Sequence, residues 1–226
     1  MPPYDGLNLG YHVGDEWDRA SANRQLVANA VGLSLRRFSF AQQPHGAGVL
    51  VIPAGRVGAN ALRRGARGVD ALVTTAVDAP LVILVGDCVP LLLADASVGV
   101  IAAVHAGRKG LVAGVVRESL GAMADQGAVV SRMAARLGPS ICGQCYELPE
   151  DIVDAVEAVV PGTRTTTRAG TAGVDVAAGV TAQLRDAGVV DIVADPACTA
   201  EDGRYFSYRR DGTTGRFAGA VWLASA

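Results

Sequence analysis

The chain has 226 residues, of which 50% are hydrophobic and 19% charged, so it can bury the core of one sizeable globular domain and is not a disordered segment. A formal net charge of -2 and a pI near 5.9 give no electrostatic basis for binding nucleic acid or an anionic membrane, and small solutes are the expected partners. No apolar run reaches the length of a membrane span, and residues 1–10 lack the basic and apolar segments of a signal peptide, which predicts a cytoplasmic protein with reduced thiols.

The first eighty-five residues predict one helix and several short strands. Asp15 can cap a helix that runs from Glu16 to about Val31, where a glycine ends it. Strands are expected at 36–41, 48–53, 70–76 and 81–85, and a surface stretch rich in Gly, Ala and Arg at 54–68. The loop 42–46 falls between two of these strands, so His45 is expected on a turn and not in a core.

The segment 85–110 predicts a hairpin that carries one reactive side chain near each outer end. Its two strands, 90–94 and 99–104, are short and apolar, and the residues between them are compact enough for a turn. With a loop formed by Ala96 and Ser97, the register places Cys88 directly opposite His105 on one face of the ribbon. Side chains opposed in this way have Cβ atoms about 4.5–5.5 Å apart, which suits two ligands of one metal ion or a thiol beside its base.

The same pair has a plainer interpretation, because free cysteines are among the most buried residue types. Cys88 would then be a structural core thiol, and His105 a core histidine with its hydrogen bonds satisfied. A slip of one residue in the register would also place the two side chains on opposite faces.

The residues after His105 predict a helix from Leu111 to about Asp125. Its N-terminus would lie close to His105, where free backbone N–H groups, two glycines and the charge of Lys109 could bind an anion or a phosphate. Lys109 is the only lysine of the chain. The segment matches no Walker motif, however, and its glycines and lysine could simply shape an exposed turn.

The remainder of the chain alternates strands and helices. The expected elements are a strand at 137–141, helices at 149–159 and 174–187, a strand at 189–194, and a final hairpin of 204–210 and 216–223 with arginines crowded at one end.

Cys142 and Cys145 form a C-x-x-C motif. A structural zinc site needs four ligands, and from the sequence only Cys198 and a distant histidine could complete one. A redox motif is expected at the start of a helix, whereas residues 146–149 intervene before the next helix. The sequence therefore favours a non-metallic pair.

The histidines, of which the chain has 3, weigh against two other metal-dependent classes. Zinc deaminases of the H-x-E and P-C-x-x-C type are excluded, because no histidine is followed two residues later by glutamate. A copper-dependent polyphenol oxidase of the laccase type needs several imidazole-rich copper centres, which so few histidines disfavour.

An ordered set of motifs resembles the YfiH-like family, whose members are variously called laccase-domain proteins, peptidoglycan-editing factors and purine nucleoside phosphorylases. The motifs include Q-P-H-G at 43–46, D-C-V-P at 87–90, H-A-G at 105–107 and F-S-Y-R-R-D at 206–211. The resemblance covers nearly the whole chain. Its implied fold is a single α/β domain of the α+β type over residues 1–226, with mixed β-sheets packed as a sandwich and helices on the outside.

The resemblance also implies that His45, Cys88 and His105 bind one metal ion, with Zn²⁺ as the expected cofactor and Cu²⁺ as the alternative. The predicted hairpin selects the same cysteine and one of the same histidines. Two departures from the family pattern are visible. The family usually begins about one strand earlier, with an arginine near the pocket, and Arg108 stands where the family motif H-A-G-W-x-G has an aromatic residue.

The activity implied by the resemblance is cleavage of the glycosidic bond of adenosine, inosine or methylthioadenosine by phosphate, with some deamination of adenosine. A purine nucleoside and phosphate are therefore the expected partners. Three ligands leave a fourth zinc position for water or a substrate oxygen, and Lys109 or Arg209 could hold the phosphate. The strand that ends at Arg209 and Arg210 faces the active site in the family, and alternation along a strand lets only one of them reach it, which we expect to be Arg209.

Two further alternatives stay open. A cysteine-based amidase or hydrolase would use Cys88 as nucleophile and His105 as base on a peptidoglycan precursor. A non-enzymatic interaction protein would use the metal only for stability, and would unfold when the metal is lost.

Overall fold

The computed structural model describes residues 3–58 and 65–225. The helices are α1 (Trp17–Ala30), α2 (Arg108–Ala113), α3 (Val115–Asp125), α4 (Glu150–Val159), α5 (Val176–Asp186) and α6 (Tyr208–Asp211). The strands are β1 (Ser39–Phe40), β2 (Val49–Val51), β3 (Ala71–Thr74), β4 (Leu81–Val85), β5 (Val89–Asp95), β6 (Val100–Ala106), β7 (Ala134–Leu137), β8 (Arg164–Thr166), β9 (Ala172–Val174), β10 (Asp191–Ala194) and β11 (Phe217–Val221). Within the described ranges, no helix has the length and apolar character of a transmembrane segment.

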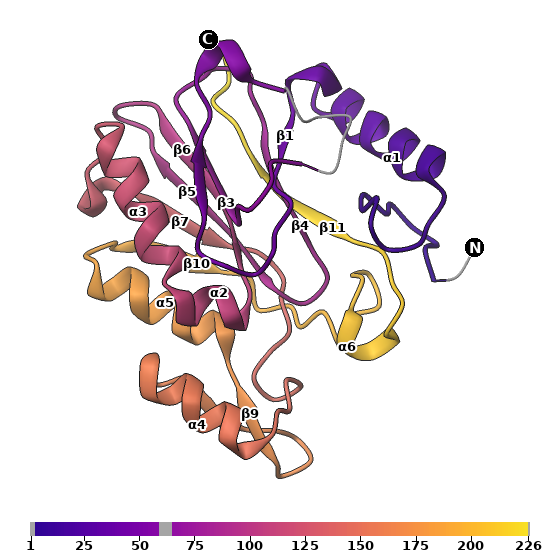
Figure 1. The fold of residues 1–226 in the computed structure, drawn as a ribbon, viewed down its shortest axis with the longest axis vertical. Coiled ribbons are helices and arrows are strands. Elements are labelled where there is room, and N and C mark those ends of the chain that lie inside the picture. The colour runs from indigo at the N-terminus through magenta and orange to yellow at the C-terminus, as the bar shows by residue number, and fades with distance from the viewer. Residues whose placement is uncertain (1–2, 59–64, 226) are drawn as a thin grey trace.

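A six-stranded mixed sheet, in the order β10-β7-β5-β6-β3-β2, forms the centre of the molecule (Figure 1). Its two middle strands, β5 and β6, pair antiparallel from Val89↔Ala106 to Asp95↔Val100. Every residue of β6 is buried, which explains why its sequence is apolar except for His105, because a strand covered on both faces does not alternate with polar residues.

A smaller sheet, in the order β1-β4-β11, packs against one face of the large sheet. Alternation along β4 divides its side chains between two cores. Ile83 packs with Leu72 and Ile101 of the large sheet, whereas Val82 and Leu84 point the other way, into the cluster that includes residues of α1.

Helices α2, α3 and α5 cover the opposite face of the large sheet, while α4 lies beside the β8–β9 ribbon at the lower end of the view in Figure 1. The layers therefore run from α1 through the small sheet and the large sheet to α2, α3 and α5. This arrangement confirms the predicted sandwich of mixed sheets with helices on the outside.

Several predicted element boundaries were wrong. Residues 36–37 belong to a 3₁₀ helix, Leu35–Arg37, and not to a strand. The N-cap of α1 is Glu16, without a side-chain cap bond, because the Asp15 carboxylate accepts hydrogen bonds from the Asn8 side chain and the Glu16 N–H instead. The strand expected at 137–141 ends at Leu137, before the proline at 139 that cannot donate to a ladder.

Two corrections bear on the site. The helix expected from Leu111 begins three residues earlier, at Arg108, and is broken into α2 and α3 at Gly114, whose φ of 89° a helix interior cannot adopt. The first strand of the final hairpin is absent. Residues 208–211 instead form the short helix α6, capped by the Ser207 hydroxyl, which accepts a hydrogen bond from the Arg210 N–H.

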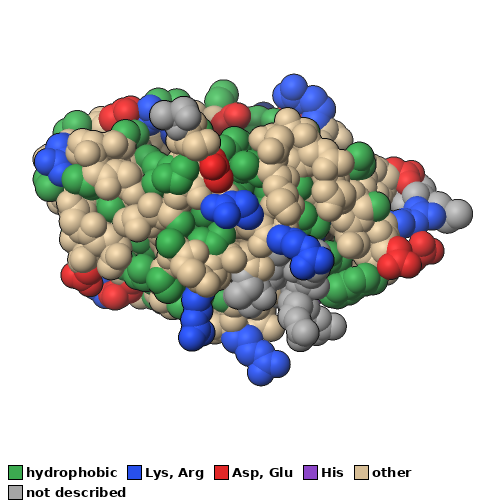
Figure 2. Space-filling model, turned by 90° about the horizontal axis from the view of Figure 1, so that it is seen from above, with side chains coloured by type: hydrophobic (Ala, Val, Ile, Leu, Met, Phe, Trp, Pro, Cys, Tyr) green, Lys and Arg blue, Asp and Glu red, His purple; other side chains and the backbone are tan. Residues whose placement is uncertain are grey.

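The surface view agrees with the balanced composition. On the face shown in Figure 2, lysine and arginine side chains stand singly among acidic, polar and hydrophobic groups, and they form no continuous basic surface. This face therefore lacks the basic stripe typical of a nucleic-acid interface.

Candidate active site

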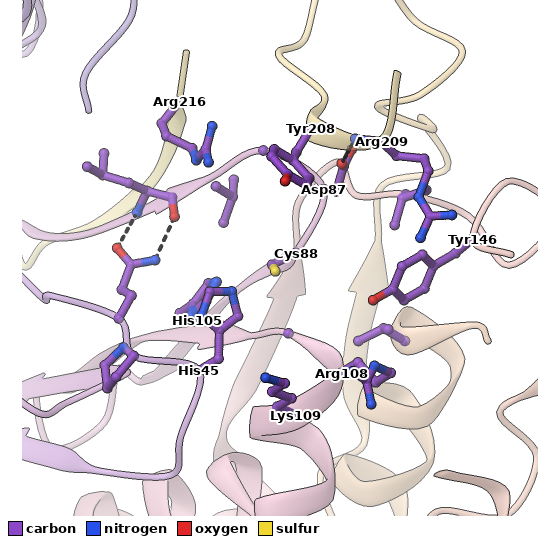
Figure 3. A pocket seen from close by; sticks show the side chains of 18 of the residues that line it. His45, Asp87, Cys88, His105, Arg108, Lys109, Tyr146, Tyr208, Arg209 and Arg216 are labelled. Carbon is purple, nitrogen blue, oxygen red and sulfur yellow. Dashed lines mark hydrogen bonds between the residues drawn. The ribbon is translucent and has the colours of Figure 1, made fainter. Parts of the chain in front are cut away.

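A cavity of about 640 Å³ opens where the ends of β4 and β6 meet the loops at 42–45, 86–88 and 141–146 and the helix α6 (Figure 3). This volume is in the range of small-molecule sites. The polar side chains that line it are His12, Gln42, Gln43, His45, Asp87, Cys88, His105, Arg108, Lys109, Tyr146, Tyr208, Arg209 and Arg216.

His45, Cys88 and His105 converge on the wall of this cavity. Each offers one ligand atom, and the three atoms lie within 4.8 Å of one another. The two imidazole rings meet edge to face, with centroids 4.7 Å apart and planes at 78°. Imidazole nitrogens and a thiolate are the donors that Zn²⁺ and copper ions accept, so the cluster can hold one such ion.

The register that predicted the Cys88–His105 pair was wrong by two residues. Pro90, and not Cys88, lies opposite His105, and the connecting loop is 96–99. The wider turn is organised by Asp95, whose carboxylate accepts hydrogen bonds from the N–H and hydroxyl of Ser97. A shift of two residues preserves the face, so Cys88 and His105 still point to the side of the small sheet.

The loop that carries His45 is fixed by hydrogen bonds to β4 of the small sheet. The Gln43 side chain donates to the Leu84 carbonyl at 2.6 Å and accepts from the Leu84 N–H at 2.9 Å (Figure 3). Gln43 and His45 have φ values of 61° and 65°, an uncommon conformation for residues other than glycine. Such backbone persists where the surroundings over-determine it, which is typical of functional sites.

Asp70 joins the two histidines. Its buried carboxylate accepts the N–H of His45 at 2.9 Å and the N–H of Gly46 at 2.7 Å, and it lies 2.9 Å from Nδ1 of His105. A carboxylate behind a histidine fixes the ring orientation and the tautomer, leaving the other ring nitrogen for a ligand. Sequence analysis placed this residue at the start of an expected strand, 70–76, and gave it no role in the site.

The charges of Cys88 and His105 depend on each other. Burial would raise the pKa of the Cys88 thiol, but the neighbouring His105 and His45 rings lower the pKa to about 6. Burial likewise disfavours the His105 imidazolium, yet the Cys88 thiolate and Asp70 raise the pKa of His105 to about 9. At neutral pH without a metal, the pair is therefore a thiolate beside an imidazolium.

Gly107 leaves room for this cluster. A Cβ at this position would lie 2.9 Å from the Cys88 sulfur and 3.1 Å from a carbon of the His45 ring, too close for either contact. The glycine of the H-A-G motif thus keeps this space open, because a side chain here would shift the Cys88 thiol and press on the His45 ring.

Cationic side chains occupy the other walls of the cavity. Lys109 lines the cavity from the first turn of α2, and Arg209 lines it from α6. The sequence did not single out Arg108 and Arg216 as anion-binding residues, yet both line the same space. Nε of Arg108 is buried and makes no hydrogen bond with the described residues.

Arg209 and Arg210 lie on a helical turn, so the strand alternation used to choose between them does not apply. Their surroundings nevertheless differ. The Arg209 guanidinium donates to the Glu147 carbonyl at 2.8 Å and lies 5.0 Å from the ring centre of Tyr146, at the cavity. The Arg210 guanidinium turns back into the fold and donates to the carbonyls of Thr199 and Tyr205.

Asp87 holds this part of the wall in place. Its carboxylate accepts hydrogen bonds from the hydroxyls of Thr199 and Ser207 at 2.6 and 2.7 Å, and from the Arg209 N–H at 2.7 Å. The residue preceding Cys88 therefore ties the side of the cavity that carries Cys88 to α6.

A second cluster lies outside the cavity walls. Cys142, Cys145, Cys198 and Glu201 bring their ligand atoms within 4.8 Å of one another. The sequence interpretation held that only Cys198 and a distant histidine could complete a site, and it missed Glu201 as a possible fourth donor. Burial and the Cys198 thiol raise the pKa of Cys142. Burial, Cys142 and Cys198 raise the pKa of Cys145 to about 12, and both shifts are the opposite of the activation that redox cysteines need.

Comparison with known proteins identifies the family. Residues 1–224 match the family described as multi-copper polyphenol oxidoreductase laccase. The chain belongs to this laccase family. It is 49% identical over 221 residues to a purine nucleoside phosphorylase of Streptomyces coelicolor, covering 98% of this chain and 89% of that protein. A purine nucleoside phosphorylase of Mycobacterium tuberculosis is 47% identical over 222 residues, covering 98% and 86%.

Two solved structures share the fold of this chain. YlmD of Geobacillus stearothermophilus gives a TM-score of 0.93 at 28% identity, covering 100% of this chain and 87% of that one. The YfiH protein of Bacillus licheniformis gives a TM-score of 0.92 at 26% identity, covering 99% and 88%. These matches confirm the resemblance to YfiH-like proteins.

The metal-donor side chains of this chain do not match those that the name laccase implies. Of its 3 histidines, His45 and His105 share one cluster with a thiol, and His12 lines the cavity outside that cluster. Several imidazole-rich copper centres cannot be assembled from this set.

Proposed function

We propose that this protein is a metal-dependent purine nucleoside phosphorylase, with one Zn²⁺ held by His45, Cys88 and His105. The observation that carries the proposal is the cavity itself, in which three metal donors face cationic side chains across a space of nucleoside size. Relatives named purine nucleoside phosphorylase, at 47–49% identity over 98% of the chain, support it.

The donor set fits zinc. Two imidazoles and one thiolate are three protein ligands, as in catalytic zinc sites that keep one position for water or substrate. Asp70 behind His105 supplies the supporting carboxylate that such sites use. When bound, the ion would act as a Lewis acid and lower the pKa of a coordinated water to roughly 7.

The protein side chains have separate roles in phosphorolysis. Arg108, Lys109 and Arg209 would bind the phosphate, whose oxygen attacks C1′ of the ribose as the bond from C1′ to the purine nitrogen breaks. The bonding electron pair leaves with the purine, which takes up a proton, and ribose 1-phosphate is the second product. The ring of Tyr146, beside Arg209, offers a flat surface on which the base can stack.

A nucleoside panel tests this function directly. Purified protein of measured zinc content is incubated with adenosine, inosine and methylthioadenosine, with and without phosphate. We expect free base and a pentose 1-phosphate to form only when phosphate is present. Conversion of adenosine to inosine without phosphate would reveal deamination, and absence of base release from every nucleoside by folded, zinc-loaded protein would refute the proposal.

A cysteine hydrolase is the second candidate, favoured by the thiolate–imidazolium pair. In zinc-free protein, alkylation of Cys88 should follow a midpoint near pH 6 and not the roughly 8.5 of an ordinary thiol, because the thiolate predominates above its lowered pKa. Added zinc should suppress the reaction, since a coordinated thiolate is a poor nucleophile. Mass spectrometry of the Cys88 peptide across pH gives both results. Full reactivity in zinc-loaded protein would favour the hydrolase.

A further inference from the structure

We propose that Cys142, Cys145, Cys198 and Glu201 form a second zinc site, structural and separate from the cavity. Three sulfurs and one carboxylate oxygen lie within 4.8 Å of one another. Four protein ligands close the coordination shell of Zn²⁺, which distinguishes a structural site from a catalytic one. The cluster contains neither His45 nor Cys88 nor His105, so the proposal does not depend on the proposed function.

The backbone builds the cluster from two matching turns. In the first, the N–H groups of Cys145 and Tyr146 donate to the Cys142 carbonyl at 3.0 and 3.1 Å. In the second, the N–H groups of Glu201 and Asp202 donate to the Cys198 carbonyl at 3.1 and 2.9 Å. Each turn places two ligands three residues apart, the spacing that zinc sites use repeatedly.

The two turns are held against each other. Ser140 and Cys198 form a parallel β-bridge, and the Thr199 N–H donates to the Ser140 carbonyl at 3.0 Å. The Cys142 N–H also donates to the sulfur of Cys198 at 3.3 Å. The fold therefore brings the ligands together through main-chain bonds, which a chance meeting of surface thiols would lack.

Arg168 is the group that a metal ion would displace. Its guanidinium lies 2.7 Å from Oε1 of Glu201, and the Cys145 thiol donates to the same oxygen at 3.4 Å. The Arg168 side chain is 63% exposed, and such surface ion pairs contribute little. It can turn into solvent when Zn²⁺ takes its place beside the carboxylate.

The site is positioned to support one wall of the cavity. Ile141 and Tyr146 flank the first turn and line the cavity. Thr199 lies within the second turn, and its hydroxyl donates to Asp87. A metal joining the turns would fix the loop that carries Tyr146 relative to the segment that leads to α6.

Zinc stoichiometry tests the proposal. Wild-type protein and a Cys142→Ser/Cys145→Ser variant are each loaded with Zn²⁺, desalted and analysed for metal. We expect the variant to contain one zinc per chain fewer than the wild type, whatever the occupancy of the cavity, and to unfold at a lower temperature. A Cys88→Ala/His105→Ala variant reports the cavity metal separately, so failure of one site is distinguished from failure of the other.

Two further measurements keep the proposal falsifiable if the double variant folds poorly. In wild-type protein, Zn²⁺ should protect Cys142, Cys145 and Cys198 from alkylation, and a chelator should restore their reactivity. Glu201→Gln should weaken zinc binding at this site, whereas Arg168→Ala should strengthen it. Three results would each overturn the proposal. They are equal zinc content in wild type and variant, alkylation that zinc does not affect, and a disulfide among the three cysteines in freshly purified protein.

Discussion

Replacement of both Cys88 and His105 by alanine should lower kcat/KM for phosphorolysis by about 1000-fold or more and remove the cavity metal. Two of its three ligands would be lost, and the remaining His45 is an exposed side chain on a loop. The Lewis acidity of a bound metal is worth several kcal/mol of transition-state stabilisation, and each 1.36 kcal/mol corresponds to a factor of ten in rate. Zinc analysis and steady-state kinetics on the same preparation check both parts.

The matched control for this variant is Cys142→Ser/Cys145→Ser, which removes two cysteines outside the cavity. This control variant should mainly lose thermal stability, whereas the Cys88→Ala/His105→Ala variant should lose activity first. Full activity in the Cys88→Ala/His105→Ala variant would show that the converging imidazoles and thiol have no part in the reaction.

The core strands follow from patterns that are local in the sequence, whereas the layered fold was implied only by the resemblance to YfiH-like proteins. Apolar strands such as 81–85 and 100–106 are buried on both faces in the structure, and their hydrophobic sequences already predicted core strands. The Cys88–His105 juxtaposition was also predictable despite the wrong register. Side-chain direction repeats every two residues, so an error of two residues in the loop length leaves both groups on the same face.

Features that depend on distant segments were not predictable. Asp70 comes close to His45 and His105 only in the folded chain. No spacing in the sequence predicts these hydrogen bonds. Glu201 comes beside Cys142 across 59 positions of the chain through a parallel bridge at Ser140, so the sequence did not reveal it as a donor beside the three cysteines. The YfiH-like resemblance pointed to the cavity residues, but it carried no information on this cluster.

Arg209 and Arg210 show a different limit of prediction from the sequence. Local alternation favoured Arg209 on the assumption of a strand, but α6 is a helical turn and the Ser207 cap determines its direction. Arg209 lines the cavity because its backbone N–H is held by Asp87, the residue next to Cys88. The position of this side chain therefore depends on a contact between residues 122 positions apart.

Arg209→Ala should lower kcat/KM for phosphorolysis by roughly 30- to 1000-fold while zinc content and thermal stability barely change. A guanidinium can bind a phosphate through two parallel hydrogen bonds, and removal of such a charged contact costs about 2–4 kcal/mol of transition-state stabilisation. The side chain donates to a single carbonyl of the protein, that of Glu147, so the fold loses little. Arg209→Lys should recover part of the activity, because it restores the charge but not the planar pair of donors.

Arg210→Ala is the neighbouring control and should behave in the opposite way. Its guanidinium donates to the carbonyls of Thr199 and Tyr205 and pairs with Asp211, so its loss should lower the melting temperature by several degrees. Its effect on the phosphate dependence should be small, because these bonds face the fold and not the cavity. Phosphate titrations at saturating nucleoside separate the two variants. If neither changes the apparent KM for phosphate or kcat, the anion is bound by Arg108 and Lys109 on the opposite wall, and Arg209 has no role in holding it.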